Sequence, residues 1–373
     1  MNANKKIIAY FFGALNRGGA ETLVYDVCKK KDYAPFEIVC LYRKDGEYTA
    51  AYRGTGVKMI KVNQKGQNFI RFLRSFRKTV LDNHIDIIHA QTGFNALICI
   101  FSLLGTPVKL ITTFHGFSFA SAPWWQRKLV YKKNEQLLCV SEYEKNYYER
   151  KWNLPPVNKL RVVYNGIDFS KLDNSVSDNN APINLDRNGL NMIMVGSFRS
   201  GRSQAFICQV ADRLNQRGFP FSLYFAGRRD EKEFQRYDDC VHYCASHNLS
   251  EKVHFLGARN DIANLLRQMD LFVYASEHDT FGIAVLEAIA SSIPVIVNDW
   301  TVMKEITHDG QYARLYETDN IEDCISKIMD IHRAYSEMPE TLQKETDTAA
   351  SAIREQFSIE HHIDTLNDVY LSV

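Results

Sequence analysis

Two acidic side chains near position 280 are the residues of this sequence best placed to do chemistry. Asp279 comes just before Phe281-Gly282, where the pattern predicts that a helix opens, and Glu287 lies two turns along that helix. The first backbone N–H groups of a helix have no partner within it, so they can bind a negative phosphate. The amides that we expect at this phosphate site belong to Phe281, Gly282 and Ile283.

Glu287 has a strongly apolar setting for a charged residue. A carboxylate in such a setting needs a polar partner, because burying an unpaired charge is costly. The hydroxyls of a ribose would supply one, and a phosphate site followed by a hydroxyl-binding carboxylate suits a nucleotide-sugar. We therefore predict a sugar-transfer enzyme. The neighbours of Glu287 are Val285, Leu286, Ala288, Ile289 and Ala290.

The loop after the first predicted strand is rich in glycine. Gly18 and Gly19 allow a ligand to approach the backbone closely, and a helix is expected from Ala20. A single glycine-rich turn is a weak signal, and its spacing is not that of the dinucleotide-binding fingerprint. Glu21, in the first turn, is explained as well by the ordinary preference for a carboxylate at a helix start.

Two other strand ends carry candidate ligand-binding side chains. His115 stands beside Gly116 at the end of a predicted strand, so we expect it to face a ligand, and a purely structural histidine is the alternative. Arg199 and Arg202 lie in a loop between a strand and a helix, where guanidinium groups can clamp a diphosphate. Two solvated loop arginines are the alternative there.

Short apolar runs alternate with helical patterns from end to end, as in parallel sheets covered by helices. We predict an α/β fold of two doubly wound Rossmann-like domains that face a central cleft, with ligands at the carboxyl ends of the strands. After the last predicted strand, only helices are expected. The predicted strands are 7–12, 36–42, 57–62, 85–90, 108–114, 136–141, 160–165, 190–196, 221–227, 252–257, 271–275 and 294–298.

The domain boundaries follow from one polar segment. Residues 171–189 are rich in Asn, Asp and Ser and have no periodicity, so they are the best linker candidate. The predicted N-terminal domain is therefore 1–170 and the C-terminal domain 190–356, with a final helix in 357–373.

Charge is divided unevenly along the chain. Residues 1–170 carry 26 Lys and Arg against 13 Asp and Glu, a net charge of +13, and the remainder carries a net charge of −12. This asymmetry predicts that the N-terminal domain meets an anionic partner, although two oppositely charged domains could simply attract one another. Segments 67–80 and 124–133 combine Lys and Arg with Phe and Trp, which suits contact with an anionic membrane surface; helices with solvated basic faces are the alternative.

Composition limits the other classes of protein. No apolar run approaches the roughly 20 residues that span a bilayer, and the N-terminal apolar run is better explained as a first strand than as a signal peptide. The eight scattered cysteines are typical of reduced thiols in a cytosolic protein. Cys240 and Cys244 lie near two histidines, but no second ligand pair follows, so we expect no metal site.

Six motifs in order along the chain together resemble family 4 of the retaining glycosyltransferases, of the two-Rossmann-domain (GT-B) type. The resemblance implies that Gly18 and Gly19 pack against the donor diphosphate and that His115 lies near the transferred sugar. It also implies that Arg199 and Arg202 neutralise phosphates, that Glu287 binds the ribose, and that the last helix (359–371) crosses back to the N-terminal domain. The motifs are GGAE (18–21), FHG (114–116), YNGID (164–168), GSFRSGR (196–202), VHFLGARNDIANLL (253–266) and DTFGIAVLEAIASSIPVIV (279–297).

The chain departs from the family at two positions. The family signature is two glutamates separated by seven residues, whereas this chain has Asp279 and Glu287; Glu277 is two residues out of register. The shorter Asp279 side chain is expected to alter contacts with the donor sugar. Arg202 replaces the usual phosphate-side lysine, which keeps the charge but changes the geometry. The predicted catalytic residues are His115, Asp279 and Glu287.

The predicted activity is that of a retaining, metal-independent hexosyltransferase. We expect it to move a sugar from a nucleotide-sugar, with UDP favoured, to a glycan or lipid-linked glycan in bacterial surface polysaccharide or lipopolysaccharide synthesis. The expected location is the cytoplasm, at the inner membrane face, with no nucleic-acid partner. Two alternatives stay open: a sugar-nucleotide epimerase or hydrolase on the same fold, and a non-catalytic nucleotide-sugar-binding partner.

Overall fold

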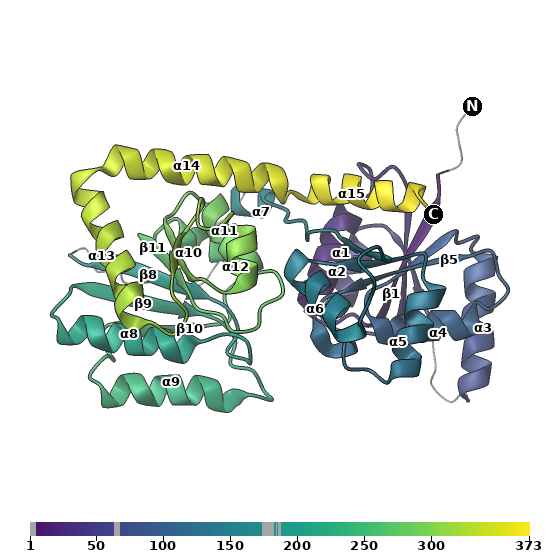
Figure 1. The fold of residues 1–373 in the computed structure, drawn as a ribbon, viewed down its shortest axis with the longest axis horizontal. Helices are drawn as coiled ribbons and strands as arrows, with labels where there is room; N and C mark the ends of the chain where they lie inside the picture. Colours follow the sequence, from purple (N-terminus) through teal and green to yellow (C-terminus); the bar gives the residue numbers. More distant parts are fainter. Residues whose placement is uncertain (1–4, 63–67, 174–182, 184, 186–187) are drawn as a thin grey trace. The chain divides into compact units, whose positions relative to one another are not determined.

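The chain folds into two units, each built around its own parallel sheet. The computed structural model describes residues 5–62, 68–173, 183, 185 and 188–373. Unit 1 comprises Met1–Ile167 together with Phe357–Val373, and unit 2 comprises Asp168–Gln356. Figure 1 shows the strands and helices of both units.

Unit 1 contains a seven-stranded sheet in the order β3-β2-β1-β4-β5-β6-β7, with every pair parallel. Ile8 of the central strand lies beside Ile38 and Ile87 of its two neighbours. The strand order reverses between β1 and β4, the position at which doubly wound sheets bind ligands. The strands are β1 Ile7–Ala14, β2 Glu37–Lys44, β3 Lys58–Lys61, β4 Ile87–Ala90, β5 Lys109–Phe114, β6 Gln136–Cys139 and β7 Leu160–Val162.

Helices cover both faces of this sheet because successive strand residues point to opposite sides. On β1, Ala9 and Phe11 pack into one core with the helices α3 to α6, whereas Ile8 and Tyr10 pack into a second core with α1, α2 and α15. The helices are α1 Gly19–Lys29, α2 Thr49–Gly54, α3 Phe69–Asp82, α4 Gly93–Ser102, α5 Trp124–Lys133, α6 Glu142–Trp152 and α15 Ile359–Leu371. A short 3₁₀ turn, Phe117–Phe119, follows β5.

The C-terminal helix α15 belongs to unit 1. Ile167 donates its backbone N–H to the carbonyl of Phe357, and Ile359 donates back to the carbonyl of Ile167. Ser358 caps the helix through its side chain, and Tyr370 near the other end is fully buried. The helix therefore completes the core on the side of the sheet that α1 covers.

Unit 2 contains a six-stranded parallel sheet in the order β10-β9-β8-β11-β12-β13. The strands are β8 Leu190–Val195, β9 Phe221–Ala226, β10 Val253–Gly257, β11 Leu271–Tyr274, β12 Val295–Asn298 and β13 Arg314–Tyr316. The helices are α7 Ser170–Asp173, α8 Gln204–Gln216, α9 Phe234–Ser246, α10 Ile262–Leu266, α11 Ile283–Ala290, α12 Thr301–Ile306, α13 Ile321–Glu337 and α14 Pro339–Gln356.

Two features of unit 2 differ from the sequence-based expectation. Strand β13 was not predicted, because three residues that begin with an exposed arginine carry no readable apolar pattern. The start of the predicted linker, 171–173, belongs to helix α7, and Asp173 accepts two hydrogen bonds from Arg354. Most of the remaining predicted linker (174–182, 184 and 186–187) lies outside the described residues.

The predicted fold class is confirmed: each unit is a parallel, Rossmann-like sheet with alternating helices. All eight cysteines are free and buried, with Cys240 and Cys244 on α9.

Candidate functional site

Helix α11 begins two residues later than predicted. The sequence placed its opening at Phe281-Gly282, but the helix runs from Ile283 to Ala290, and Gly282 is its N-cap. Glu287 is therefore just over one turn into the helix, not two, and its side chain is partly buried. Phe281 is 3% exposed, so this residue can face a ligand only through its backbone.

A glycine is required at the N-cap of α11. Gly282 has a φ of 90°, a left-handed conformation that L side chains rarely adopt. A Cβ there would also lie 3.0 Å from both the Met303 and the Ile306 side chains. Within the described part of the chain, no side chain caps this helix start. Uncapped N–H groups of this kind are what the phosphate-site prediction requires.

Asp279 is held by a tyrosine that the sequence analysis did not single out. The Tyr274 hydroxyl lies 2.5 Å from Oδ2 of Asp279, and Nε of Arg202 donates to the same hydroxyl at 3.0 Å. Two predicted site residues, Arg202 and Asp279, are thus connected through the hydroxyl of Tyr274. Its position at the carboxyl end of a buried strand could have suggested a role in the site. In the sequence, however, Tyr274 reads as one more apolar residue of the strand.

The two arginines of the predicted phosphate clamp have different environments. Arg199 is exposed, whereas Arg202 is partly buried and its pKa is raised, chiefly by Tyr274 and also by Asp279. Arg202 is therefore charged at any physiological pH. Glu277, which is out of register with the family signature, accepts a hydrogen bond at 2.5 Å from Ser203, the N-cap residue of α8.

In unit 1, helix α1 also begins at a glycine without a side-chain cap. Gly18 is the N-cap and Gly19 the first helical residue. A Cβ on Gly18 would lie 2.5 Å from Oε2 of Glu21, so even alanine would displace that carboxylate. By contrast, Asn68, Thr92 and Ser141 cap the helices α3, α4 and α6 through their side chains.

His115 follows β5 and is fixed by Gln91, another residue that the sequence analysis missed. Nε2 of His115 lies 2.9 Å from Oε1 of Gln91, and the other end of that amide donates to the His89 carbonyl at 3.3 Å. Because an amide oxygen only accepts, His115 carries its proton on Nε2. Burial lowers the pKa of His115 to about 3, so the ring is neutral and Nδ1 is an acceptor.

A small pocket adjoins His115, with room for about one water molecule. His89, within its lining, hydrogen-bonds Tyr370 at 2.7 Å and Thr113 at 2.6 Å. Asn165, only 8% exposed, has a buried side-chain oxygen that finds no hydrogen-bond partner among the described residues. The lining is Tyr10, Leu23, Val24, His89, Gln91, Thr113, His115, Val163, Asn165, His362 and Leu366.

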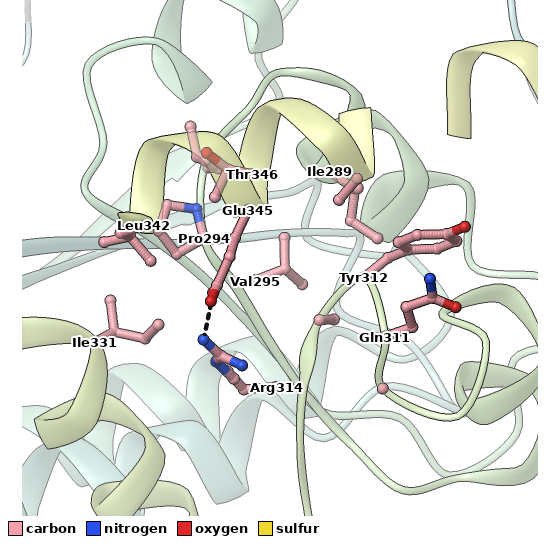
Figure 2. A pocket seen from close by; sticks show the side chains of 14 residues that line it. Ile289, Pro294, Val295, Gln311, Tyr312, Arg314, Ile331, Leu342, Glu345 and Thr346 are labelled. Atoms are coloured by element: carbon pink, nitrogen blue, oxygen red, sulfur yellow. Dashed lines mark hydrogen bonds and ion pairs between the residues drawn. The ribbon is translucent and has the colours of Figure 1, made fainter. Parts of the chain in front are cut away.

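Figure 2 shows a second pocket, in unit 2, that contains none of the predicted site residues. About 400 Å³ of open space lies between α11, α13, α14 and the segment before β13. Most of its lining residues are apolar, but Arg314 and Glu345 also line it and form an ion pair at 2.6 Å. We regard it as a packing gap under α14.

The described residues show neither a metal-binding cluster nor a membrane-spanning helix. They contain no group of three or more His, Cys, Asp or Glu side chains placed to hold a metal ion. No helix among them combines the length and the apolar character needed to cross a membrane.

The two Rossmann-like units, each with a helix that starts at a glycine, share the fold of a solved glycosyltransferase from Rickettsia africae ESF-5, which has a TM-score of 0.83 at 17% identity and covers 99% of this chain and 98% of that one. The model described as Glycosyltransferase Family 4 matches residues 17–171, and the model described as Glycosyl transferases group 1 matches residues 177–348. The chain therefore belongs to the family 4 glycosyltransferases of GT-B type, and the predicted family is confirmed.

Individual relatives agree with this assignment. EpsF of Bacillus subtilis (strain 168), named as a glycosyltransferase, is 27% identical over 84% of this chain and 85% of its own length. The Escherichia coli UDP-Gal:alpha-D-GlcNAc-diphosphoundecaprenol alpha-1,3-galactosyltransferase is 25% identical over 82% of this chain and 80% of its own. The crystal structure of Anabaena Alr3699/HepE in complex with UDP and glucose has a TM-score of 0.78 at 15% identity, covering 98% of this chain and 99% of that one.

Proposed function

We propose that this protein transfers a hexose from a nucleotide-sugar to a glycan or lipid-linked glycan, with retention of anomeric configuration. The observation that carries the proposal is the carboxyl edge of the second sheet. There Arg202 and Asp279 are joined through Tyr274, a few residues before the uncapped start of α11. A fixed cation and free helix amides are the groups that bind a diphosphate.

In the proposed mechanism, unit 2 stabilises the leaving group. Arg202 and the amides at the start of α11 (Gly282 and Ile283) would meet the negative charge that develops on the diphosphate. Arg199, which is exposed, would approach the same phosphates from solvent. Glu287 would accept hydrogen bonds from the ribose. Since these groups neutralise the phosphates, we propose that no divalent cation is required.

Unit 1 would contribute neutral groups to the transferred sugar. His115 offers Nδ1 as an acceptor to a sugar hydroxyl, because its Nε2–H is bound to Gln91. Asp279 would take a second sugar hydroxyl. The leaving phosphate, held close to the acceptor hydroxyl, would receive the proton of that hydroxyl, which is consistent with retention. Gly18 and Gly19 would leave room for the diphosphate beside α1.

The donor base that we propose is uridine. HepE was crystallised with UDP and glucose, and the Escherichia coli relative is named for a UDP-Gal donor and a diphosphoundecaprenol-linked acceptor. Both names support a UDP-sugar donor, and the second supports a lipid-linked acceptor in surface polysaccharide synthesis. The reaction would then take place in the cytoplasm at the inner membrane face.

A basic and aromatic surface of unit 1 supports the membrane contact. Helices α3, α4 and α5 pack side by side, and apolar side chains stay exposed along them. Trp124 is 67% exposed and Trp125 47%, and Nζ of Lys128 lies 5.7 Å from the Trp124 ring. Within 67–80, Phe72 and Phe76 are buried in the core, so Phe69 and Ile70 are the apolar residues that this surface presents. The exposed basic residues of α3 and α5 are Arg71, Arg74, Lys78, Lys128, Lys132 and Lys133.

A thermal-shift screen against UDP-, GDP- and ADP-sugars, with and without EDTA, tests the donor proposal. A ligand that binds only the folded protein raises its melting temperature. We expect stabilisation by UDP-sugars that EDTA does not remove and that Glu287→Ala loses. The absence of any shift would reject the donor site. Donor breakdown to a free or epimerised sugar, with no transfer to any glycan, would favour a hydrolase or an epimerase, and donor binding without any turnover would favour a binding partner.

A further inference from the structure

Tyr274 occupies a fixed position between the core of unit 2 and its predicted phosphate site. It is the last residue of β11 and is fully buried. Its ring stacks with that of Phe272 at 5.9 Å between centroids, and its carbonyl accepts a hydrogen bond from the Tyr316 hydroxyl at 2.9 Å. The backbone and the ring are thus held by the core, and the hydroxyl alone reaches the edge of the sheet.

The direction of each hydrogen bond at this hydroxyl follows from chemistry. A guanidinium has no acceptor, so Nε of Arg202 must donate to the Tyr274 oxygen. The phenolic proton is then left for Oδ2 of Asp279, at 2.5 Å. The result is a chain from a cation through a neutral hydroxyl to a carboxylate, in which each bond strengthens the other.

The opposite side of Arg202 is confined by a glycine. A Cβ on Gly196 would lie 2.9 Å from Cδ of Arg202 and 3.0 Å from its Nε. Nη1 of Arg202 also reaches the Ser197 carbonyl at 3.4 Å. The guanidinium plane is therefore set by the protein groups around it.

Asp279 is held from a second direction as well. Its backbone N–H donates to the Ser276 hydroxyl at 3.1 Å, and the Ser276 hydroxyl donates to the Gly201 carbonyl at 3.1 Å. The loop that carries Asp279 is thereby tied to the loop that carries Arg202. The Asp279 side chain is one methylene shorter than the glutamate of the family signature. The Tyr274 hydroxyl donates a hydrogen bond to its carboxylate.

We propose that Tyr274 is a positioning residue of the donor site, which fixes Arg202 and Asp279 as one unit before the donor binds. The inference rests on the proposed function, in which Arg202 contacts the donor diphosphate. A site whose cation is already oriented loses less side-chain freedom on binding, so the hydroxyl increases affinity without touching the ligand.

Isothermal titration with UDP tests this inference through Tyr274→Phe, which removes one oxygen and keeps the ring. We expect UDP to bind about tenfold more weakly. Tyr335→Phe is the control, since it also removes a tyrosine hydroxyl of unit 2 that donates to a backbone carbonyl, that of Asp270 at 2.7 Å, and not to Tyr274, Arg202 or Asp279. Its UDP affinity should stay within about twofold of wild type. Melting temperatures of both variants report whether each is folded.

A double-mutant cycle with Arg202→Lys separates positioning from a general structural effect. Lysine keeps the charge but lacks the fork that binds the tyrosine and a phosphate together. In the Arg202→Lys background, Tyr274→Phe should therefore weaken UDP binding by less than about twofold. An undiminished loss in that background, or wild-type affinity of Tyr274→Phe alone, would overturn the inference. If wild-type protein binds no UDP, the donor-site proposal fails and this inference with it.

Discussion

At the carboxyl edge of the first sheet the polar side chains are neutral and buried, whereas at the edge of the second sheet they are charged and hydrogen-bonded to one another. In unit 1, burial lowers the pKa of His89 and His115 to about 3 and that of His362 to about 4. In unit 2, Arg202 is held in its charged form next to Asp279 through Tyr274. Both edges begin a helix at an uncapped glycine.

This difference shows how one architecture can present two kinds of chemistry. A neutral histidine binds a hydroxyl without the cost of removing a charge from water. An oriented arginine binds a phosphate through charge-assisted hydrogen bonds. The comparison therefore fits the proposed roles of two side chains, in which His115 of unit 1 contacts the sugar and Arg202 of unit 2 contacts the diphosphate.

The strongest test of the charged edge is Arg202→Met. We expect the catalytic efficiency to fall about 100-fold or more, because the variant removes a fixed donor to the developing charge. The measurement is kcat/KM with the donor that the thermal-shift screen identifies. Arg199→Met is the matched control; since Arg199 is exposed, we expect a loss below about tenfold. If both variants lose kcat/KM equally, Arg202 is no more important to transition-state binding than the exposed Arg199.

The neutrality of the unit 1 edge predicts sensitivity to acid. His89 is neutral in the folded protein, with a pKa of about 3, but titrates near its ordinary value of about 6.5 when unfolded. The unfolded state thus binds a proton first as pH falls, and stability is lost from about pH 6.5 downward toward pH 3. At pH 5 the protonation of this histidine alone has lowered the free energy of unfolding by about 2 kcal/mol.

Unfolding free energies of wild type and His89→Gln between pH 8 and pH 5 check this prediction. We expect the variant to be less stable at pH 8, because the bonds to Tyr370 and Thr113 are disturbed, but to show a shallower acid slope. His242→Gln, at an exposed position, should leave the slope unchanged. If the unfolding free energy of His89→Gln falls with acid as steeply as that of wild type, His89 is not neutral in the folded protein.

Gln91 offers a way to sharpen the assignment of His115. Gln91→Leu removes the acceptor of the His115 Nε2–H, so both tautomers become available and we expect turnover to fall about tenfold. Nitrogen NMR of the labelled histidine should show Nε2 protonated in wild type and a mixture in the variant. Gln91→Glu retains an acceptor oxygen and should keep the wild-type tautomer. A wild-type tautomer in Gln91→Leu would show that other contacts fix the ring.

The smallest effect is expected outside both edges, on the basic surface of unit 1. Trp124→Ala should weaken binding to vesicles that contain anionic lipid by severalfold, through loss of an exposed aromatic ring from the interface. Cosedimentation with anionic and with neutral vesicles measures it. Trp300→Ala, in unit 2, is the control. If wild-type protein binds neither kind of vesicle, the membrane contact is wrong.

The sequence alone determined the class of fold and the family. Runs such as 271–275 are apolar throughout, because parallel strands are buried on both faces, so the alternation with helices was readable. Gly282 and Glu287 were also readable, since a glycine before an apolar helix and a carboxylate within it are both unusual. Strand β13 was not, because its pairing with β12 rather than its composition makes it a strand.

Only the tertiary structure decided which side chains support the predicted site residues. Gln91 and His115 are 24 residues apart, and Arg202 and Tyr274 are 72 residues apart, so no local pattern links either pair. They meet because parallel strands end at a common edge and bring distant loops together. Spacing along the chain predicted which groups face a ligand, whereas hydrogen-bond geometry across the sheet fixed the tautomer of His115 and the orientation of Arg202.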